Sequence, residues 1–152
     1  MLSLTSRRTK GHNGFSLIEL LVAIGIIAIL VAIAIPIYLG QREKAQDSAA
    51  KSVVRNAMIA VESAYVDTRD FSAIVDADLT AIEVSMAFID AANAATAPTA
   101  DAEANEVNWR GTGAATYEVG SLSRSGKTFG AAVDKDTSGG NTFYVDGAVH
   151  GW

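Results

Sequence analysis

A single carboxylate near the N-terminus borders a long apolar segment, shortly after a glycine that could mark a cleavage site. Glu19 lies four residues after Phe15 and directly before an uncharged run from Leu20 to Leu39. An ionised side chain within a membrane segment is costly unless an opposite charge compensates it. Cleavage after Gly14 would give Phe15 a free α-amine, which is a cation near neutral pH. We therefore predict that Glu19 pairs with this amine, within one helix or between neighbouring helices, and that the pairing promotes assembly.

A simpler interpretation of Glu19 also stays open. The residue lies near the cytoplasmic end of the apolar run, so its carboxylate could reach the lipid headgroups without a protein partner. In that case the carboxylate would be tolerated in the membrane but would have no part in assembly.

The segment from Leu20 to Leu39 is long enough to cross a membrane. Its 20 residues rise about 1.5 Å each in a helix, which gives about 30 Å, the thickness of the hydrocarbon layer. The leader, Met1 to Gly14, contains Arg7, Arg8 and Lys10 and no acidic residue. The positive-inside rule therefore predicts a cytoplasmic N-terminus and an exported body.

Two other targeting signals would also fit this region. Ala32-Ile33-Ala34 has the small-residue pattern of a signal-peptide cleavage site, and Arg7-Arg8 could belong to a twin-arginine signal. The apolar run nevertheless continues past Ala34, and paired arginines are common before membrane segments. Neither pattern requires cleavage after Gly14.

Two residues inside the apolar run weaken a helix. Pro36 removes one backbone hydrogen bond and clashes with the preceding turn, so we expect a kink or local melting between Ala32 and Pro36. Gly25 is a second weak point. The alternative is that both residues are simply tolerated, as they often are in membrane helices.

The helix is expected to continue past the membrane segment as an amphipathic half over residues 40–66. No Pro or Gly occurs between Gln41 and Tyr65, and small apolar residues recur every three or four positions from Ala45 to Ala64. We predict that this stripe packs against the chain's own domain, while the apolar half over residues 15–39 protrudes.

The remaining residues, 67–152, change to a period of two and predict a sheet. Four short strands are expected, at Val107–Arg110, Thr116–Val119, Thr128–Val133 and Thr142–Val145. Short turns rich in glycine separate them and favour antiparallel neighbours. The apolar stripe of the helix can cover one face of this sheet. The predicted fold class is therefore α+β, with one long helix against an antiparallel sheet of three to four strands.

Two further elements are predicted between the helix and the sheet. Asp78 to Glu83 could form a short helix capped by Asp78. Ala91 to Ala104 is a low-complexity stretch rich in Ala, Thr, Pro and Asp, which indicates a surface loop and not a packed element.

The residues that remain show no pattern typical of an enzyme or of a cofactor site. The chain has no cysteine, and His12 and His150 stand far apart near the two ends. Asp134 and Asp136 resemble the start of a calcium loop, although a polar turn is the alternative, because Val145 occupies the position that would need a bidentate Glu. Without its leader the chain has 9 basic and 17 acidic residues, which argues against direct nucleic-acid binding.

The N-terminal region resembles a known family. The run Gly14-Phe15-Ser16-Leu17-Ile18-Glu19-Leu20, with an apolar segment that ends Ala34-Ile35-Pro36-Ile37-Tyr38, is similar to the class III leader of type IV pilins and pseudopilins. The resemblance covers about Gly11 to Ala64, and the head only in general layout. It implies the pilin fold, cleavage of residues 1–14 between Gly14 and Phe15 by a membrane prepilin peptidase, and N-methylation of Phe15.

The resemblance also implies partners and a location. The precursor would be a single-pass protein of the cytoplasmic membrane, and an inner-membrane platform with a cytoplasmic ATPase would assemble it into a surface filament. Identical subunits would form a helical homopolymer in which Glu19 meets the Phe15 amine of the next subunit, and the helix near Pro36 would loosen. Adhesion, twitching motility and DNA uptake are activities of such filaments.

Several features depart from the family or leave alternatives open. Ala28 stands where a glycine is frequent, and a disulfide cannot close the C-terminal loop. We expect strand pairing and the aromatic side chains of Phe143, Tyr144 and Trp152 to hold that loop. The alternatives to a pilus subunit are a pseudopilin of a type II secretion system and a membrane-tethered, exported binding domain that does not polymerise.

Overall fold

The computed structural model describes residues 14–136 and 140–152. The predicted basic leader, apart from Gly14, lies outside the described residues, as do residues 137–139 of the predicted calcium loop and turn. The chain divides into two compact units, Met1–Leu39 and Gly40–Trp152. The helix α1 (Leu17–Thr68) contributes residues to both units, which are described separately here.

In the first unit, the described residues from Leu17 onward belong to α1, and their side chains are exposed. By length and composition α1 is able to cross a membrane, and none of its most apolar stretch is buried within the protein. α1 stays helical from Ala32 through Pro36. The structure therefore does not show the local melting expected near Pro36. Loosening of the helix in a filament stays a prediction.

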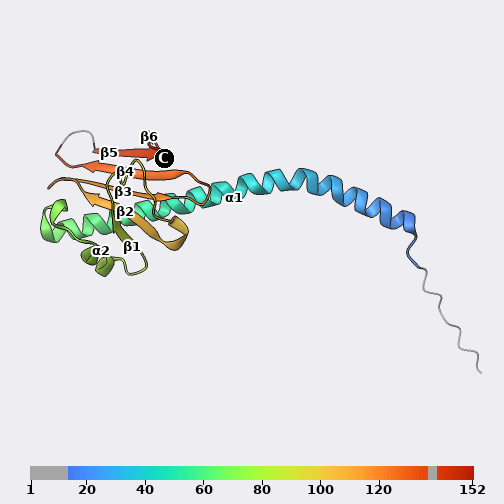
Figure 1. Ribbon diagram of the computed structural model, residues 1–152, viewed down its shortest axis with the longest axis horizontal. Coiled ribbons are helices and arrows are strands. Elements are labelled where there is room, and N and C mark those ends of the chain that lie inside the picture. The colour runs from blue at the N-terminus through green and yellow to red at the C-terminus, as the bar shows by residue number, and fades with distance from the viewer. Residues whose placement is uncertain (1–13, 137–139) are drawn as a thin grey trace, which may run out of the picture. The chain divides into compact units, whose positions relative to one another are not determined.

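The second unit is an α+β domain, as predicted, with a six-stranded sheet in the order β1-β2-β3-β4-β5-β6 (Figure 1). The strands are β1 (Ala87–Asp90), β2 (Glu106–Gly111), β3 (Thr116–Leu122), β4 (Thr128–Asp134), β5 (Gly140–Val145) and β6 (Ala148–Val149). The shorter helical elements are η1 (Phe71–Ala73), α2 (Asp76–Ile82) and η2 (Ala102–Ala104). From β2 to β6 neighbouring strands are antiparallel, whereas β1 pairs with β2 in parallel.

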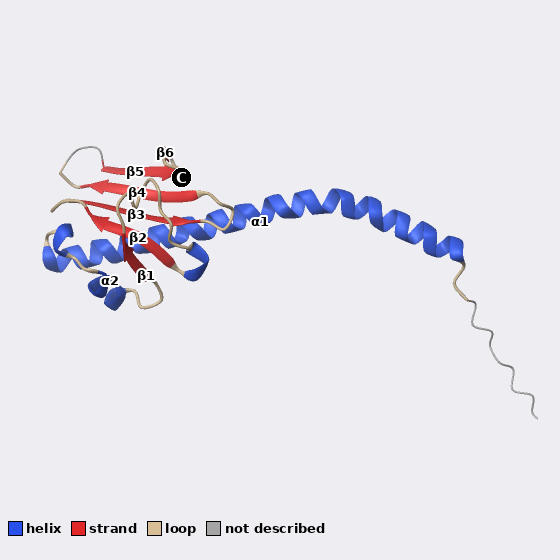
Figure 2. Cartoon of the chain, viewed as in Figure 1, coloured by secondary structure: helices blue, strands red, loops and turns tan. Residues whose placement is uncertain are grey.

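The second half of α1 covers one face of this sheet (Figure 2). Its buried residues are Ala50, Val53, Val54, Ala57, Ala60, Val61 and Ala64. They follow the predicted stripe from Val53 onward, whereas Ala45 and Ala49 of that stripe are exposed. Alternate residues of the strands, among them Val119, Ala131 and Val133, complete the core from the sheet. Small side chains on the helix allow its backbone to lie close to the sheet, and apolar burial holds the two layers together.

The opposite face of the sheet carries the segment before η2, and here the prediction of a surface loop over Ala91–Ala104 was wrong. Ala94, Ala95, Ala100 and Ala102 are all buried. Asn108 of β2 is also buried, and its Oδ1 accepts hydrogen bonds from the backbone N–H groups of Thr99, at 2.6 Å, and Ala100, at 2.9 Å. The segment is therefore a packed layer, because a buried side chain satisfies its backbone.

Two other predictions need correction. The sheet has six strands where three to four were expected, since β1 and the two-residue β6 were not foreseen. Asp78 does not cap α2 from the N-cap position. Val75 occupies that position, and Asp78, three residues later, accepts a hydrogen bond from the Val75 backbone N–H at 3.2 Å.

Candidate functional site

The predicted cleavage position lies just before the first turn of α1. Gly14, Phe15 and Ser16 have non-helical backbone, and α1 begins at Leu17. The Phe15 side chain is 82% exposed, and a side chain at Gly14 would meet no atom within 4 Å. Among the described residues, none beyond the chain neighbours of Gly14 therefore packs within 4 Å of its Cβ position.

Glu19 has a local role in this first turn that the sequence analysis missed. The backbone N–H of Ser16 donates a hydrogen bond to Glu19 Oε2 at 3.0 Å, and Leu20 N–H donates to the Ser16 carbonyl at 3.2 Å. Glu19 thus makes one of the two hydrogen bonds of a capping box, which satisfies an N–H group that the helix start leaves without a partner. A negative charge in the first turn is also favourable toward the helix dipole. The spacing Ser-x-x-Glu in the sequence could have predicted this contact.

The structure brings three of the predicted site residues, Gly14, Phe15 and Glu19, together at the start of α1. Gly25 and Pro36 lie further along the same helix. A side chain at Gly25 would meet no atom within 4 Å, so no packing contact requires a glycine there.

The apolar surface of the first unit is continuous. The large apolar side chains between Phe15 and Leu39 are all at least 44% exposed. An exposed apolar surface of this extent is unstable in water and needs a lipid bilayer or other apolar helices around it. The helix start therefore combines the bond predicted to be cleaved, a carboxylate and a surface suited to lipid or to helix packing.

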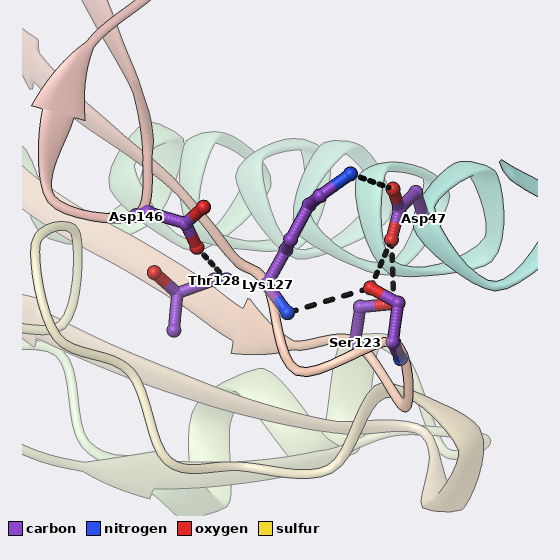
Figure 3. A network of polar contacts seen from close by, with 6 residues as sticks. Asp47, Ser123, Lys127, Thr128 and Asp146 are labelled. Carbon is purple, nitrogen blue, oxygen red and sulfur yellow. Dashed lines mark hydrogen bonds and ion pairs between the residues drawn. The ribbon is translucent and has the colours of Figure 1, made fainter. Parts of the chain in front are cut away.

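A polar cluster joins the second half of α1 to the β3–β4 turn (Figure 3). The Asp47 carboxylate accepts hydrogen bonds from Ser123 Oγ, at 3.0 Å, and from Ser125 Oγ, and it pairs with Lys127 Nζ at 3.0 Å. Burial acts to raise the pKa of Asp47, but the hydrogen bonds from Ser125, Lys127 and Ser123 outweigh it and leave this pKa below its ordinary value. Asp47 therefore stays ionised and fixes the turn to the helix.

A second polar cluster lies around Glu62 of α1. The hydroxyl of the buried Tyr117 donates a hydrogen bond to Glu62 Oε1 at 3.1 Å, and Lys135 forms an ion pair with Glu62 Oε2. Lys135 Nζ also lies 4.3 Å from the centre of the Tyr65 ring. Burial raises the pKa of Tyr117, and the negative charge of Glu62 raises it further. The phenol therefore remains a neutral hydrogen-bond donor.

The predicted closure of the C-terminal loop is confirmed for the aromatic side chains of Phe143 and Trp152, whereas Tyr144 contributes its backbone carbonyl. Trp152 packs edge-on against Phe143, with ring centres 4.9 Å apart, and against Phe129 at 6.1 Å. Its Nε1 donates a hydrogen bond to the Tyr144 carbonyl at 3.2 Å. Strand β5 pairs with β4 along its whole length. Strand pairing and aromatic packing together hold this segment.

The two calcium candidates lie at the end of β4. Asp134 Oδ1 accepts a hydrogen bond from the backbone N–H of Asp136 at 2.9 Å. Among residues 14–136 and 140–152, no three His, Asp or Glu side chains are placed to hold a metal ion together. Asp134 thus shapes the local turn in the part that the structure describes.

Comparisons with known proteins concern the N-terminal region. Residues 9–35 match the family model described as a prokaryotic N-terminal methylation motif. The chain is also similar to the type IV wide pilus major component PilA4 of Thermus thermophilus, with 36% identity over 63 residues. That alignment covers 41% of this chain and 48% of the relative, which is about half of the relative's length. No solved structure matches the chain.

Proposed function

We propose that this chain is a structural subunit of a type IV pilus-like surface filament, because residues 9–35 match the methylation motif, 63 residues are similar to a type IV pilus major component, and α1 is long and apolar enough to cross a membrane. A pilin builds a structure and is not an enzyme. The observation that carries the proposal is the exposed apolar surface between Phe15 and Leu39, most of which lies within the motif at residues 9–35. Such a surface serves first as a membrane anchor and then as a packing surface between subunits.

Processing at the Gly14–Phe15 bond would start assembly. A prepilin peptidase at the membrane would remove residues 1–14, and the new amine of Phe15 would then be N-methylated. The non-helical backbone of residues 14–16 supports this step, because a protease needs access to an extended peptide bond. Cleavage changes the charge at the helix start from a neutral amide to a cation.

The new cation would meet the carboxylate of Glu19. In the described structure Glu19 caps its own helix through Ser16 N–H at 3.0 Å, and a carboxylate has lone pairs for further donors. The Phe15 amine of a neighbouring subunit could therefore bind Glu19 while the cap is kept. In the low dielectric of a helix bundle this pairing would set the register between subunits.

The location of the protein follows from the same scheme. The precursor would stand in the cytoplasmic membrane with its N-terminus inside and its head, Gly40–Trp152, outside. An assembly platform with a cytoplasmic ATPase would then transfer the helix from lipid into a homopolymer. Gly25 and Pro36 would let α1 bend or melt during this transfer.

N-terminal sequencing of the mature protein tests the processing step. We expect a start at Phe15 carrying an N-methyl group. A mature chain that starts at Met1 or near Ile35 would contradict the proposal, because the first keeps the leader and the second loses the apolar segment.

Electron microscopy and mass spectrometry of sheared surface fibres test the structural role. We expect fibres whose main component is this chain. A pseudopilin would be processed in the same way without being the main component of surface fibres, and a tethered binding domain would be absent from them.

A further inference from the structure

An apolar groove of about 550 Å³ lies between α1 and β5, the strand next to the β6 edge of the sheet. Arg55, Met58, Ile59 and Glu62 of α1 line it together with Phe143 of β5. Ile59 is 69% exposed, and its side chain belongs to the face of α1 that does not pack on the sheet. We call this surface the apolar groove.

The opposite edge of the same unit carries a different surface. In the sheet order β1 is the edge strand furthest from β5, and α2 packs against β1 (Figure 1). Asp67, Asp78 and Ile82 line a shallow hollow there, and Glu83 and Val84 follow directly along the chain. These five residues are called the acidic patch. Its apolar members are exposed, Val84 by 81% and Ile82 by 44%.

The two surfaces are complementary in charge. Beside the apolar groove, Lys51 and Arg55 are cations, whereas Glu62 is already neutralised by its ion pair with Lys135. The acidic patch has three carboxylates around two branched aliphatic side chains. Both surfaces therefore expose apolar area, and their charges are of opposite sign.

We infer that the apolar groove of one subunit receives the acidic patch of a second copy of this chain. This inference rests on the proposed filament function and names the head-to-head contact within it. Because the two surfaces differ and lie at opposite edges of one unit, the contact is heterologous, and in a helical filament it would repeat from copy to copy without closing. Val84 and Ile82 would lie against Ile59 and Met58, with the carboxylates toward Lys51 and Arg55.

Disulfide trapping tests the contact, since the natural chain has no cysteine. Ile59→Cys and Val84→Cys variants of the full chain are co-expressed, and their fibres are oxidised and analysed on non-reducing gels. We expect mixed dimers from the two variants together and none from either variant alone. A chain with both substitutions should give a ladder of higher multimers.

The matched control combines Ile59→Cys with Val149→Cys. Val149 is also well exposed, at 70%, but it lies on β6 at the same sheet edge as the groove. We expect no dimer from this pair. Dimers from Ile59→Cys alone would indicate a symmetric contact and overturn the inference, as would fibres in which the mixed dimer fails to form.

Reversing the charges across the contact provides a second test, which applies even if the cysteine variants form no fibres. Arg55→Glu should lower the fibre yield by about tenfold, because like charges would meet across the contact. Adding Asp67→Arg in the same chain should restore the yield, provided that thermal unfolding shows both variants to be folded. Failure of the second substitution to rescue would overturn the inference. A wild-type chain that forms no fibres would overturn the proposed function as well.

Discussion

Gly120 of β3 and Gly130 of β4 are direct partners across the sheet, and together they leave a trough in the face opposite α1. The segment before η2 lies in this trough. A Cβ atom built at Gly120 would be 2.0 Å from the Ala94 carbonyl oxygen, and one at Gly130 would be 2.0 Å from the Ala95 carbonyl oxygen. Asn108, the partner of Gly120 on β2, holds the same segment further along. The two glycines are required by close backbone approach and not by a turn.

The first prediction concerns this trough. Gly120→Ala and Gly130→Ala should each lower the free energy of unfolding by about 2 kcal/mol, because the new methyl group collides with backbone that cannot rotate away. The corresponding fall in Tm is about 10 °C, measured by thermal denaturation of the full chain in detergent.

Gly40→Ala is the matched control. Gly40 lies within α1 and has no atom within 4 Å of its Cβ position, so the substitution should stabilise the chain by up to about 1 kcal/mol. An unchanged Tm in both sheet variants would show that the segment does not occupy the trough in solution.

The second prediction concerns the pH dependence that Asp47 confers. Its pKa is lower in the folded protein than the ordinary 3.8, so its contribution is fully present above about pH 4 and is lost as the pH falls through the lower, folded value. Asp47→Asn should be less stable than wild type at neutral pH by about 1 kcal/mol.

Denaturant unfolding of both proteins between pH 7 and pH 2 measures this difference. We expect the two stabilities to converge only below the ordinary pKa of the carboxyl. Asp67→Asn is the control, because Asp67 is exposed on the same helix, and a difference of similar size there would indicate a general charge effect.

The third prediction separates the two roles of Glu19. Glu19→Gln keeps an oxygen that can accept the Ser16 N–H in a capping box but removes the charge, whereas Glu19→Ala removes both. If the ion pair with the Phe15 amine drives assembly, both variants insert into the membrane normally and both reduce incorporation into filaments by about tenfold or more.

Quantitative blotting of sheared fibres against the membrane fraction measures this ratio. Normal incorporation of Glu19→Gln together with poor incorporation of Glu19→Ala would assign the role to helix capping and refute charge pairing.

The fourth prediction concerns Trp152. Trp152→Ala removes packing against Phe143 and Phe129, as well as the contact of its ring with the Arg55 guanidinium 5.2 Å away. We expect a loss of about 2 kcal/mol and faster proteolysis after β5. Trp152→Phe, which keeps an aromatic ring, should lose less than half as much, and equal losses in both variants would show that the indole N–H bond to Tyr144 dominates.

The sequence predicted the parts of the fold that depend on local patterns. The period of three to four residues in α1 and the alternation in β2 to β5 are visible in single segments, and the structure has these elements. β1 was missed because it has only four residues, of which only Phe88 is buried. Its sequence therefore shows no alternation of apolar and polar residues. β6 is too short to give any pattern. Its two residues depend on pairing with Tyr144 and Val145.

The site was predicted unevenly for a similar reason. Gly14, Phe15 and Glu19 are recognisable because the motif is contiguous, and the capping contact of Glu19 was readable from Ser16. Asn108, Gly120 and Gly130 look like ordinary polar and turn residues in the sequence. Their importance appears only when the segment before η2, which is eight or more residues away in the chain, lies across them.

The closure of the head by Trp152, Phe129 and Phe143 has a consequence for its biogenesis. These edge-on ring contacts need no covalent bond, and the chain has no cysteine, so the head needs neither an oxidant nor a thiol isomerase to mature. Its folding is thereby independent of the redox state of its surroundings.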